Sequence, residues 1–186
     1  SVVNAFSEKL AAAMNAELTV GNGLEEGVKV GPLIDGDAVE KVTEHVQDAL
    51  DKGAELLLGG HPHPLGGSFF TPTLISQVTP EMKVAREETF GPLAAIFPFE
   101  SEEEAIEMAN DTEFGLASYF YSSDLKRVWR VSEGLDYGMV GINTGLISNA
   151  AAPFGGVKAS GLGREGGHQG LAEFLETKYL CIDLGE

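Results

Sequence analysis

The segment Arg86–Pro92 combines residue types that could bind a ribose and position a base. It reads Arg-Glu-Glu-Thr-Phe-Gly-Pro and stands immediately before an apolar run. At the edge of a strand, a carboxylate can accept two hydrogen bonds from neighbouring ribose hydroxyls, and an aromatic ring two residues further on can pack against a base. The other interpretation is a solvated acidic turn followed by a core phenylalanine. The segment taken alone leaves both interpretations open.

A second segment, Gly161–Gly166, matches the dinucleotide fingerprint GxGxxG. That fingerprint binds a pyrophosphate when a strand leads into it and an acidic residue follows about 20 residues later in a second strand. No clear strand precedes Gly161, and the sequence ends 20 residues after Gly166. The pattern therefore favours a flexible crossover between domains over a phosphate loop.

Cys181 is the only cysteine of the sequence. A nucleophilic cysteine needs a helix N-terminus, a histidine or a cation to lower its pKa, and it needs access to substrate. Cys181 lies instead in the alternating run Tyr-Leu-Cys-Ile, which is typical of a strand, so we predict that it is buried and structural. A single cysteine also excludes an internal disulfide and favours a reducing cytoplasm.

His61 and His63 raise the question of a metal site, because only one proline separates them. Two histidines leave a metal short of ligands, and no Cys, Asp or Glu stands near them in their Gly/Pro-rich loop. We expect a solvated loop and no metal.

The charge balance narrows the classes of partner. The 186 residues include 29 acidic and 12 basic side chains, which gives a formal net charge of −17. Nucleic acid and anionic lipid would repel such a protein, so neither is expected as a main partner. No apolar run approaches the ~20 residues of a membrane helix, and no secretory signal pattern begins the sequence. We therefore expect no membrane partner.

Helices are predicted where apolar residues recur at helical spacing or where a capping pair precedes them. Ser101 with Glu104, and Asp37 with Glu40, show the spacing of an N-cap and its reciprocal partner. The expected helices run from Val3 to Gly21, from Asp37 to Gly53, from Ser101 to Ala109, and from Ser123 to Leu135 with Leu125, Val128 and Trp129 directed inward.

Short runs of β-type residues alternate with these helices. They cover residues 55–58, 72–78, 93–99, 117–121, 139–143 and 178–183. This alternation indicates an α/β fold with a largely parallel, buried sheet flanked by helices. After Phe154 the composition changes, with seven glycines among residues 155–170. We therefore expect a main domain over residues 1–158, and a crossover helix with a terminal strand over residues 159–186.

The ordered motifs of the sequence add up to a family resemblance. They are Val30–Asp35 (VGPLID), Phe70–Leu74 (FTPTL), Glu87–Pro92 (EETFGP), Asn110–Leu116 (NDTEFGL) and Pro153–Gly161 (PFGGVKASG). Together they resemble the C-terminal part of the aldehyde dehydrogenase superfamily, from Val2 to Leu184. Within it, the run Gly138–Ser148, the glycine-rich run Gly161–Gly166 and the run Lys178–Cys181 are most similar to members that oxidise succinate semialdehyde.

The resemblance implies an oxidation that uses NAD or NADP. In the family, a cysteine thiolate attacks the aldehyde, a hydride passes to the coenzyme, and a glutamate-activated water hydrolyses the thioester. The segments that carry this cysteine, this glutamate and the coenzyme domain lie upstream in the family, and Cys181 does not match the nucleophile. We therefore expect the chain to be a catalytic-domain part that is inactive and binds coenzyme weakly by itself.

The resemblance also implies roles for individual residues in coenzyme binding, substrate binding and proton relay. Glu88 resembles the carboxylate that holds the nicotinamide ribose, and Phe90 resembles the ring that packs beside that ribose. Ser148 matches a hydroxyl that binds the distal carboxylate of succinate semialdehyde, together with arginines outside this sequence. Phe154 matches an aromatic residue lining the aldehyde pocket, and Glu165 matches a glutamate implicated in proton relay.

The resemblance also implies a homo-oligomer formed through residues 176–184. Lys178–Asp183 resembles a strand that extends the sheet of a neighbouring subunit, and Glu176 matches a glutamate at that interface. Two other functions stay open: a related aldehyde dehydrogenase with another substrate, such as glutarate semialdehyde, and a non-enzymatic assembly module that pairs through the terminal strand.

Overall fold

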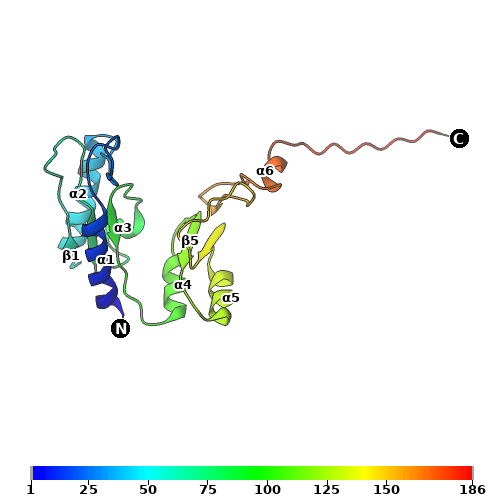
Figure 1. The fold of residues 1–186 in the computed structure, drawn as a ribbon. Coiled ribbons are helices and arrows are strands. Elements are labelled where there is room, and N and C mark those ends of the chain that lie inside the picture. The colour runs from blue at the N-terminus through cyan, green and yellow to red at the C-terminus, as the bar shows by residue number, and fades with distance from the viewer. Residues whose placement is uncertain (1, 186) are drawn as a thin grey trace. The chain divides into compact units, whose positions relative to one another are not determined.

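The computed structural model describes residues 2–185 and divides into two compact units, one ending at Pro98 and one beginning at Phe99. Figure 1 labels some of the elements of each unit. The predicted domain boundary near Lys158 falls inside the second unit and stays a prediction.

The first unit packs helices against a three-stranded sheet. Strand β2 is central and all four of its residues are buried; β1 pairs with it antiparallel and β3 pairs with it parallel. The elements are α1 (Val3–Glu17), α2 (Gly36–Asp51), β1 (Glu55–Leu58), β2 (Thr73–Ser76), α3 (Lys83–Arg86) and β3 (Leu93–Ala95).

Helix α2 begins where Asp35 caps it, which corrects the predicted cap at Asp37. The backbone of Asp35 is extended, and its carboxylate accepts a hydrogen bond from the Ala38 backbone N–H at 2.9 Å. This bond starts the helix at Gly36 and contributes about 1 kcal/mol. Asp37 falls in the first turn, where its negative charge faces the positive end of the helix.

The core of the first unit lies between α2 and the sheet. A buried cluster joins Ala49 of α2 and Ile75 of β2 to residues of the neighbouring loops. These are Ala54 before β1, and Val78 and Met82 after β2. The buried face of α2 also includes Val42, His45 and Val46. This packing fixes α2 against the strand β3 that follows the motif Glu87–Pro92.

The second unit contains two separate pairs of strands. β5 (Ala117–Phe120) pairs parallel with β6 (Met139–Ile142), and β4 (Phe114–Gly115) pairs antiparallel with β7 (Val157–Lys158). The helices are α4 (Glu102–Asn110), α5 (Leu125–Gly134) and the short α6 (Gln169–Ala172). Over both units the pairings are two parallel and two antiparallel, so the predicted largely parallel sheet is wrong: the loop after β1 turns the chain back, and β7 returns antiparallel to β4.

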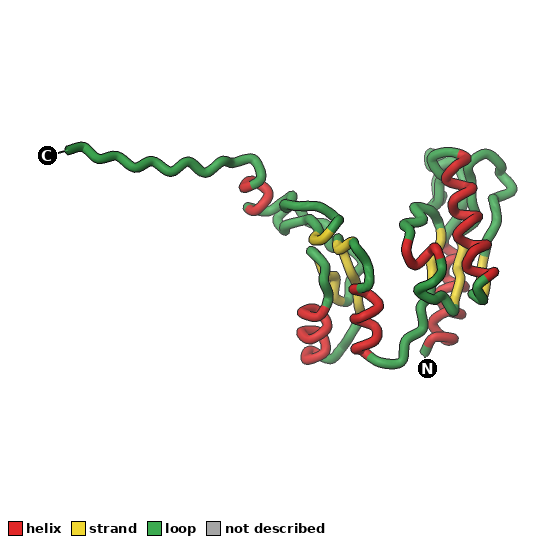
Figure 2. The backbone as a smooth tube through the Cα atoms, turned by 180° about the vertical axis from the view of Figure 1, so that it is seen from behind, coloured by secondary structure: helices red, strands yellow, loops and turns green. Residues whose placement is uncertain are grey.

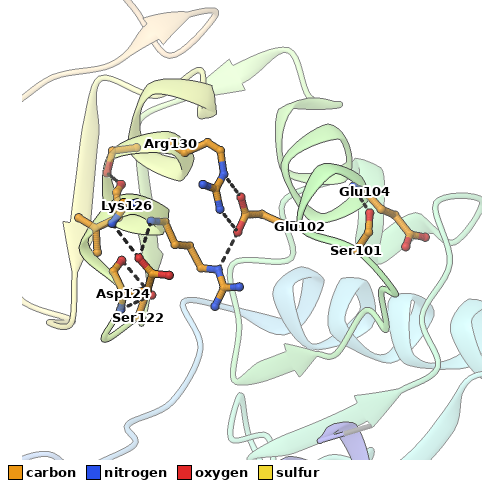
Figure 3. A network of polar contacts seen from close by, with 10 residues as sticks. Ser101, Glu102, Glu104, Ser122, Asp124, Lys126 and Arg130 are labelled. Carbon is orange, nitrogen blue, oxygen red and sulfur yellow. Dashed lines mark hydrogen bonds and ion pairs between the residues drawn. The ribbon is translucent and has the colours of Figure 1, made fainter.

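Helix α4 begins as its sequence predicts, and ion pairs join it to α5. The Ser101 hydroxyl accepts from the Glu104 N–H at 3.1 Å, and the Glu104 carboxylate accepts from the Glu100 N–H at 2.6 Å. Figure 3 shows this cap and, beside it, the carboxylate of Glu102 held by Arg130 of α5.

Helix α5 buries a different side chain from those predicted. Val131 is 9% exposed and Val128 is half-buried, whereas Leu125 and Trp129 are 70% and 65% exposed. Within the described second unit, other residues pack only against the side of α5 that carries Val131. The expected inward direction of Leu125 and Trp129 is therefore wrong for this chain by itself.

The predicted strand over residues 178–183 is not formed in the structure. Figure 2 draws the chain after α6 as loop, and residues 173–185 are exposed. A strand needs a hydrogen-bonding partner, and none of the residues 2–185 pairs with this segment. For the same reason Cys181 is exposed, which corrects its predicted burial.

Within residues 2–185, no helix has both the length and the hydrophobicity that crossing a lipid bilayer requires.

Candidate functional site

The loop that precedes β3 presents two of the predicted coenzyme residues outward. The side chains of Glu88 and Phe90 are both exposed, that of Phe90 to 83%. The backbone of Phe90 is left-handed, with φ of 52°. This conformation is rare for a bulky residue and persists where the surrounding structure enforces it, most often at functional sites.

Helix α2 supplies the structure that enforces this loop. His45 is fully buried; its Nδ1 lies 2.9 Å from the Thr89 hydroxyl oxygen, and its Nε2 lies 3.4 Å from the Glu87 carboxylate. One turn earlier on α2, Val42 contacts the loop so closely that a Cβ on Gly91 would lie 2.5 Å from it. Residues 87, 89 and 91 therefore touch the helix, and the alternate residues 88 and 90 face away.

His45 is the residue of this site that sequence reasoning missed. It occupies the same helical stripe as Val42, Val46 and Ala49, all of which are buried. A polar side chain at such a spacing must find hydrogen-bond partners when the stripe is buried, and that requirement is the signal that could have identified it.

In the second unit, the structure brings Phe154 and Glu165 together. Their backbones exchange two hydrogen bonds of 2.7 Å, in an antiparallel bridge. Both residues line a cavity of about 740 Å³, together with Leu116, Arg164, Leu171 and Phe174. A cavity of this size and mixed polarity can hold a small aldehyde with room for water.

The wall of this cavity is held by hydrogen bonds from Arg164 and by the close packing of glycine backbone. The Arg164 guanidinium donates to the carbonyl oxygens of Gly156 and Gly163, both at 2.7 Å. Gly166 has φ of +67°, and a Cβ there would lie 2.6 Å from the Ala152 carbonyl oxygen. The match to GxGxxG therefore forms a turn folded against residues 150–156, between β7 and the short α6.

Hydrogen bonds from Lys158 tie together two of the family-like motifs of the second unit. Lys158 donates to the carbonyl oxygens of Asn110 and Thr112, both at 3.1 Å, and its ammonium lies 5.9 Å from the centre of the Tyr137 ring. Burial raises the pKa of Tyr137, whose hydroxyl donates to the Ala109 carbonyl at 2.5 Å. The end of α4 is thus tied to the segment that leads out of Phe154.

Ser148 lies on the loop between β6 and β7, and it is exposed. Within residues 2–185, no hydrogen bond to the Ser148 side chain is found, so its hydroxyl is available to a ligand. Ser148 shares a unit with Phe154 and Glu165, whereas Glu88 and Phe90 belong to the other unit.

The two histidines of the Gly/Pro-rich loop serve local structure. The His61 ring nitrogen Nδ1 lies 2.9 Å from the Pro62 carbonyl, and Nδ1 of His63 accepts the Leu65 N–H at 3.3 Å. In the described part of the chain, no group of three or more metal-ligating side chains is found.

The sequence is similar to known dehydrogenases over nearly its whole length. Residues 1–180 match the aldehyde dehydrogenase family model. The 3-sulfolactaldehyde dehydrogenase of Pseudomonas putida is 63% identical, over 95% of this chain and 36% of that protein. The glutarate-semialdehyde dehydrogenase of Pseudomonas aeruginosa is 62% identical, over 97% of this chain and 37% of that protein. The succinate-semialdehyde dehydrogenase [NADP(+)] of Escherichia coli is 58% identical, over 98% of this chain and 38% of that protein.

A solved structure shares the fold as well as the sequence. The crystal structure of succinate-semialdehyde dehydrogenase from Burkholderia pseudomallei matches with a TM-score of 0.94 at 61% identity, over 97% of this chain and 37% of that chain. The chain spans 36% to 38% of the length of these relatives. Because the family model covers almost every residue, the chain belongs to the aldehyde dehydrogenase family.

Proposed function

We propose that this chain is part of the catalytic domain of a dehydrogenase that oxidises succinate semialdehyde to succinate with NAD or NADP. The observation that carries the proposal is the outward presentation of Glu88 and Phe90 by a loop anchored on α2, in a chain of this family. The name of the Escherichia coli relative, which includes NADP(+), supports the choice of coenzyme class.

The exposed side chains of the loop fit a nicotinamide ribose. The Glu88 carboxylate has two oxygens that can accept from the ribose hydroxyls, and the Phe90 ring offers an open face to the sugar. The bound coenzyme supplies a hydride acceptor. Glu88 and Phe90 would reach its nicotinamide end alone, so we expect the chain by itself to bind the coenzyme weakly.

Substrate recognition is assigned to the second unit. We assign the Ser148 hydroxyl to the distal anion of the substrate and the Phe154 ring to the apolar lining beside the aldehyde. The names of the three relatives support this class, because each refers to a short aldehyde with a carboxylate or sulfonate at its far end. A hydroxyl that donates to such an anion contributes about 1.5–3 kcal/mol.

Glu165 is assigned to proton relay, with its exposed carboxylate beside the cavity that Phe154 also lines. The covalent step and the activation of water are assigned to a cysteine and a glutamate outside this sequence. We therefore expect no oxidation of succinate semialdehyde by residues 1–186 alone. Turnover by this chain that Cys181→Ala abolishes would contradict that assignment.

A second candidate substrate is glutarate semialdehyde, which is longer by one methylene group. It is favoured by the relative of that name at 62% identity. One methylene in a pocket changes discrimination by about 1–3 kcal/mol, so the ratio of kcat/KM values for the two semialdehydes decides between them.

The test uses the Ser148→Ala variant of the full-length dehydrogenase. We expect KM for succinate semialdehyde to rise about ten- to a hundred-fold, because the lost bond to the anion is worth that range. Butanal has no distal charge, and its KM should not change. Equal effects on both substrates would make Ser148 structural. A full-length protein that oxidises neither semialdehyde would contradict the proposed substrate, and one that also oxidises no other aldehyde would favour the assembly module.

A further inference from the structure

We propose that His45 is a positioning residue for the coenzyme loop: from the buried face of α2 it fixes Glu87 and Thr89, and thereby orients Glu88 and Phe90. The inference rests on the proposed coenzyme role of Glu88 and Phe90. It assigns a function to a buried histidine that the chemistry described above does not otherwise use.

For a neutral His45 ring, the chemistry of its two partners assigns the donor and the acceptor of each hydrogen bond. A carboxylate only accepts, so Nε2–H donates to Glu87, across 3.4 Å. In the neutral ring Nδ1 is then an acceptor, and the Thr89 hydroxyl donates to it, across 2.9 Å. Both ring nitrogens are thus directed to one loop that lies more than forty residues further along the chain.

The segment before β3 runs along α2 in the opposite direction and contacts one side of the helix in sequence. The Asp48 carboxylate accepts the Lys83 backbone N–H at 2.7 Å. His45 then contacts the loop through Thr89, and Val42 contacts Gly91. His45 is therefore the central of three attachment points, each one helical turn from the next.

The central attachment lies where the backbone is strained. Phe90 has φ of 52°, between the bonded Thr89 and the closely packed Gly91. Without the His45 bonds, the loop loses the contacts that hold residues 87 and 89 inward, and Phe90 can relax to an ordinary conformation. Glu88 and Phe90 would then no longer face away from the helix together.

Such a change should alter catalysis as well as stability. Hydride transfer depends on placement of the nicotinamide at the ångström scale, so a displaced ribose contact lowers turnover. A histidine that served the core alone would change the melting temperature and leave the turnover of the folded enzyme intact. The kinetic constants of the folded enzyme therefore separate the two roles.

The experiment uses variants of the full-length dehydrogenase, assayed with succinate semialdehyde and each coenzyme. His45→Phe keeps a ring and removes both nitrogens, and Thr89→Val keeps the shape and removes the hydroxyl. We expect each variant to lower kcat about tenfold. With aldehyde deuterated at C1, each variant should also show a deuterium isotope effect on kcat, because hydride transfer has become slow. Thr89→Ser keeps the hydroxyl and should stay within about twofold of the unchanged enzyme. Since both residues act in one bond, the double variant should lose no more than His45→Phe alone.

Two controls separate positioning from stability. Val78→Ala truncates the core of the same unit and should lower the melting temperature without changing kcat well below it. Thr43→Val removes a hydroxyl from α2 that donates within the helix, to the Val39 carbonyl, and should leave kcat unchanged.

Glu88→Ala separates failure of this inference from failure of the proposed function. If Glu88→Ala lowers kcat while His45→Phe and Thr89→Val change only the melting temperature, the positioning role is overturned and the coenzyme role stands. If Glu88→Ala leaves kcat unchanged, the proposed coenzyme contact is itself wrong. Should His45→Phe fail to fold, Thr89→Val and Thr89→Ser carry the same test.

Discussion

Gly138 leaves no room for a side chain beside the proposed aldehyde pocket. A Cβ at this position would lie 2.0 Å from the Gly155 carbonyl oxygen and 2.8 Å from the Gly156 Cα. Both are backbone atoms next to Phe154, so neither can rotate away. We expect Gly138→Ala to lower the free energy of unfolding by about 1–3 kcal/mol, the usual cost of overpacking. Urea unfolding followed by circular dichroism measures the loss.

The matched control for this substitution is Gly145→Ala in the same unit. A Cβ on Gly145 meets nothing within 4 Å, and its backbone does not have a positive φ. Its effect on the free energy of unfolding should be within about 1 kcal/mol of zero, and stabilising if it restricts the unfolded chain. Equal losses in Gly138→Ala and Gly145→Ala would mean that steric exclusion is not what Gly138 provides.

At the scale of single residues, the sequence motifs point to Glu88 and Phe90 but not to His45, the buried side chain that contacts their loop. Glu88 and Phe90 could be named because they stand in an ordered motif, and the structure leaves both accessible. His45 stands in an ordinary amphipathic helix, and nothing local announces its partners 42 and 44 residues away. The left-handed backbone of Phe90 could not be predicted either, because tertiary contacts impose a conformation that the residue type disfavours.

Among the elements, α4 and α5 are joined by a pH-dependent network. Arg130 and Arg127 donate to the Glu102 carboxylate, at 2.5 and 2.7 Å. Figure 3 labels Glu102 and Arg130 of this network. The Arg130 guanidinium, followed by that of Arg127, lowers the pKa of Glu102 below its ordinary 4.5. A lowered folded-state pKa stabilises the protein above the unfolded-state pKa, and this stabilisation is lost as the pH falls through the folded-state value. We therefore expect Glu102→Gln to be destabilising at pH 7, and its difference from the unchanged chain to shrink as the pH falls below 4.5 and Glu102 becomes protonated.

The control for this network is Glu103→Gln, which removes an exposed carboxylate from the same helix turn. Chemical unfolding of both variants between pH 7 and pH 2 compares them directly. High salt should reduce the effect of Glu102→Gln, since exposed ion pairs are screened. A loss from Glu102→Gln that stays constant over this pH range would show that packing, and not charge, joins the two helices.

The elements themselves were predictable where their signals are local. β1 covers the predicted residues 55–58, and the Ser101 cap starts α4 as its spacing indicates. The cap predicted at Asp37 is wrong by two residues, because the extended backbone that makes Asp35 the cap is not visible in the sequence. Strand direction and the buried face of α5 depend on distant segments, which is why the sheet is mixed and Trp129 is exposed.

At the scale of the whole molecule, a strand that pairs with a second subunit cannot form within one chain. The segment over residues 178–183 has the alternation of a strand, yet it is exposed and unpaired within residues 2–185. Backbone N–H and C=O groups of a strand are satisfied by a neighbouring strand, and an oligomer would have to supply it. The same reasoning applies to Cys181, whose burial was predicted from that strand.

The last prediction concerns assembly through this terminal segment. Leu180, Ile182 and Leu184 share one face of the predicted strand, and all three are exposed. Covering such a stripe is favourable by about 25 cal/mol per Å² of apolar surface, whereas the net charge of −17 opposes association. At physiological salt that repulsion reaches only about 8 Å, so close strand pairing between copies can outweigh it. We expect light scattering to find a dimer or larger oligomer, and removal of residues 176–186 to yield a smaller species. Monomers in both forms would mean that the segment does not join copies of this chain.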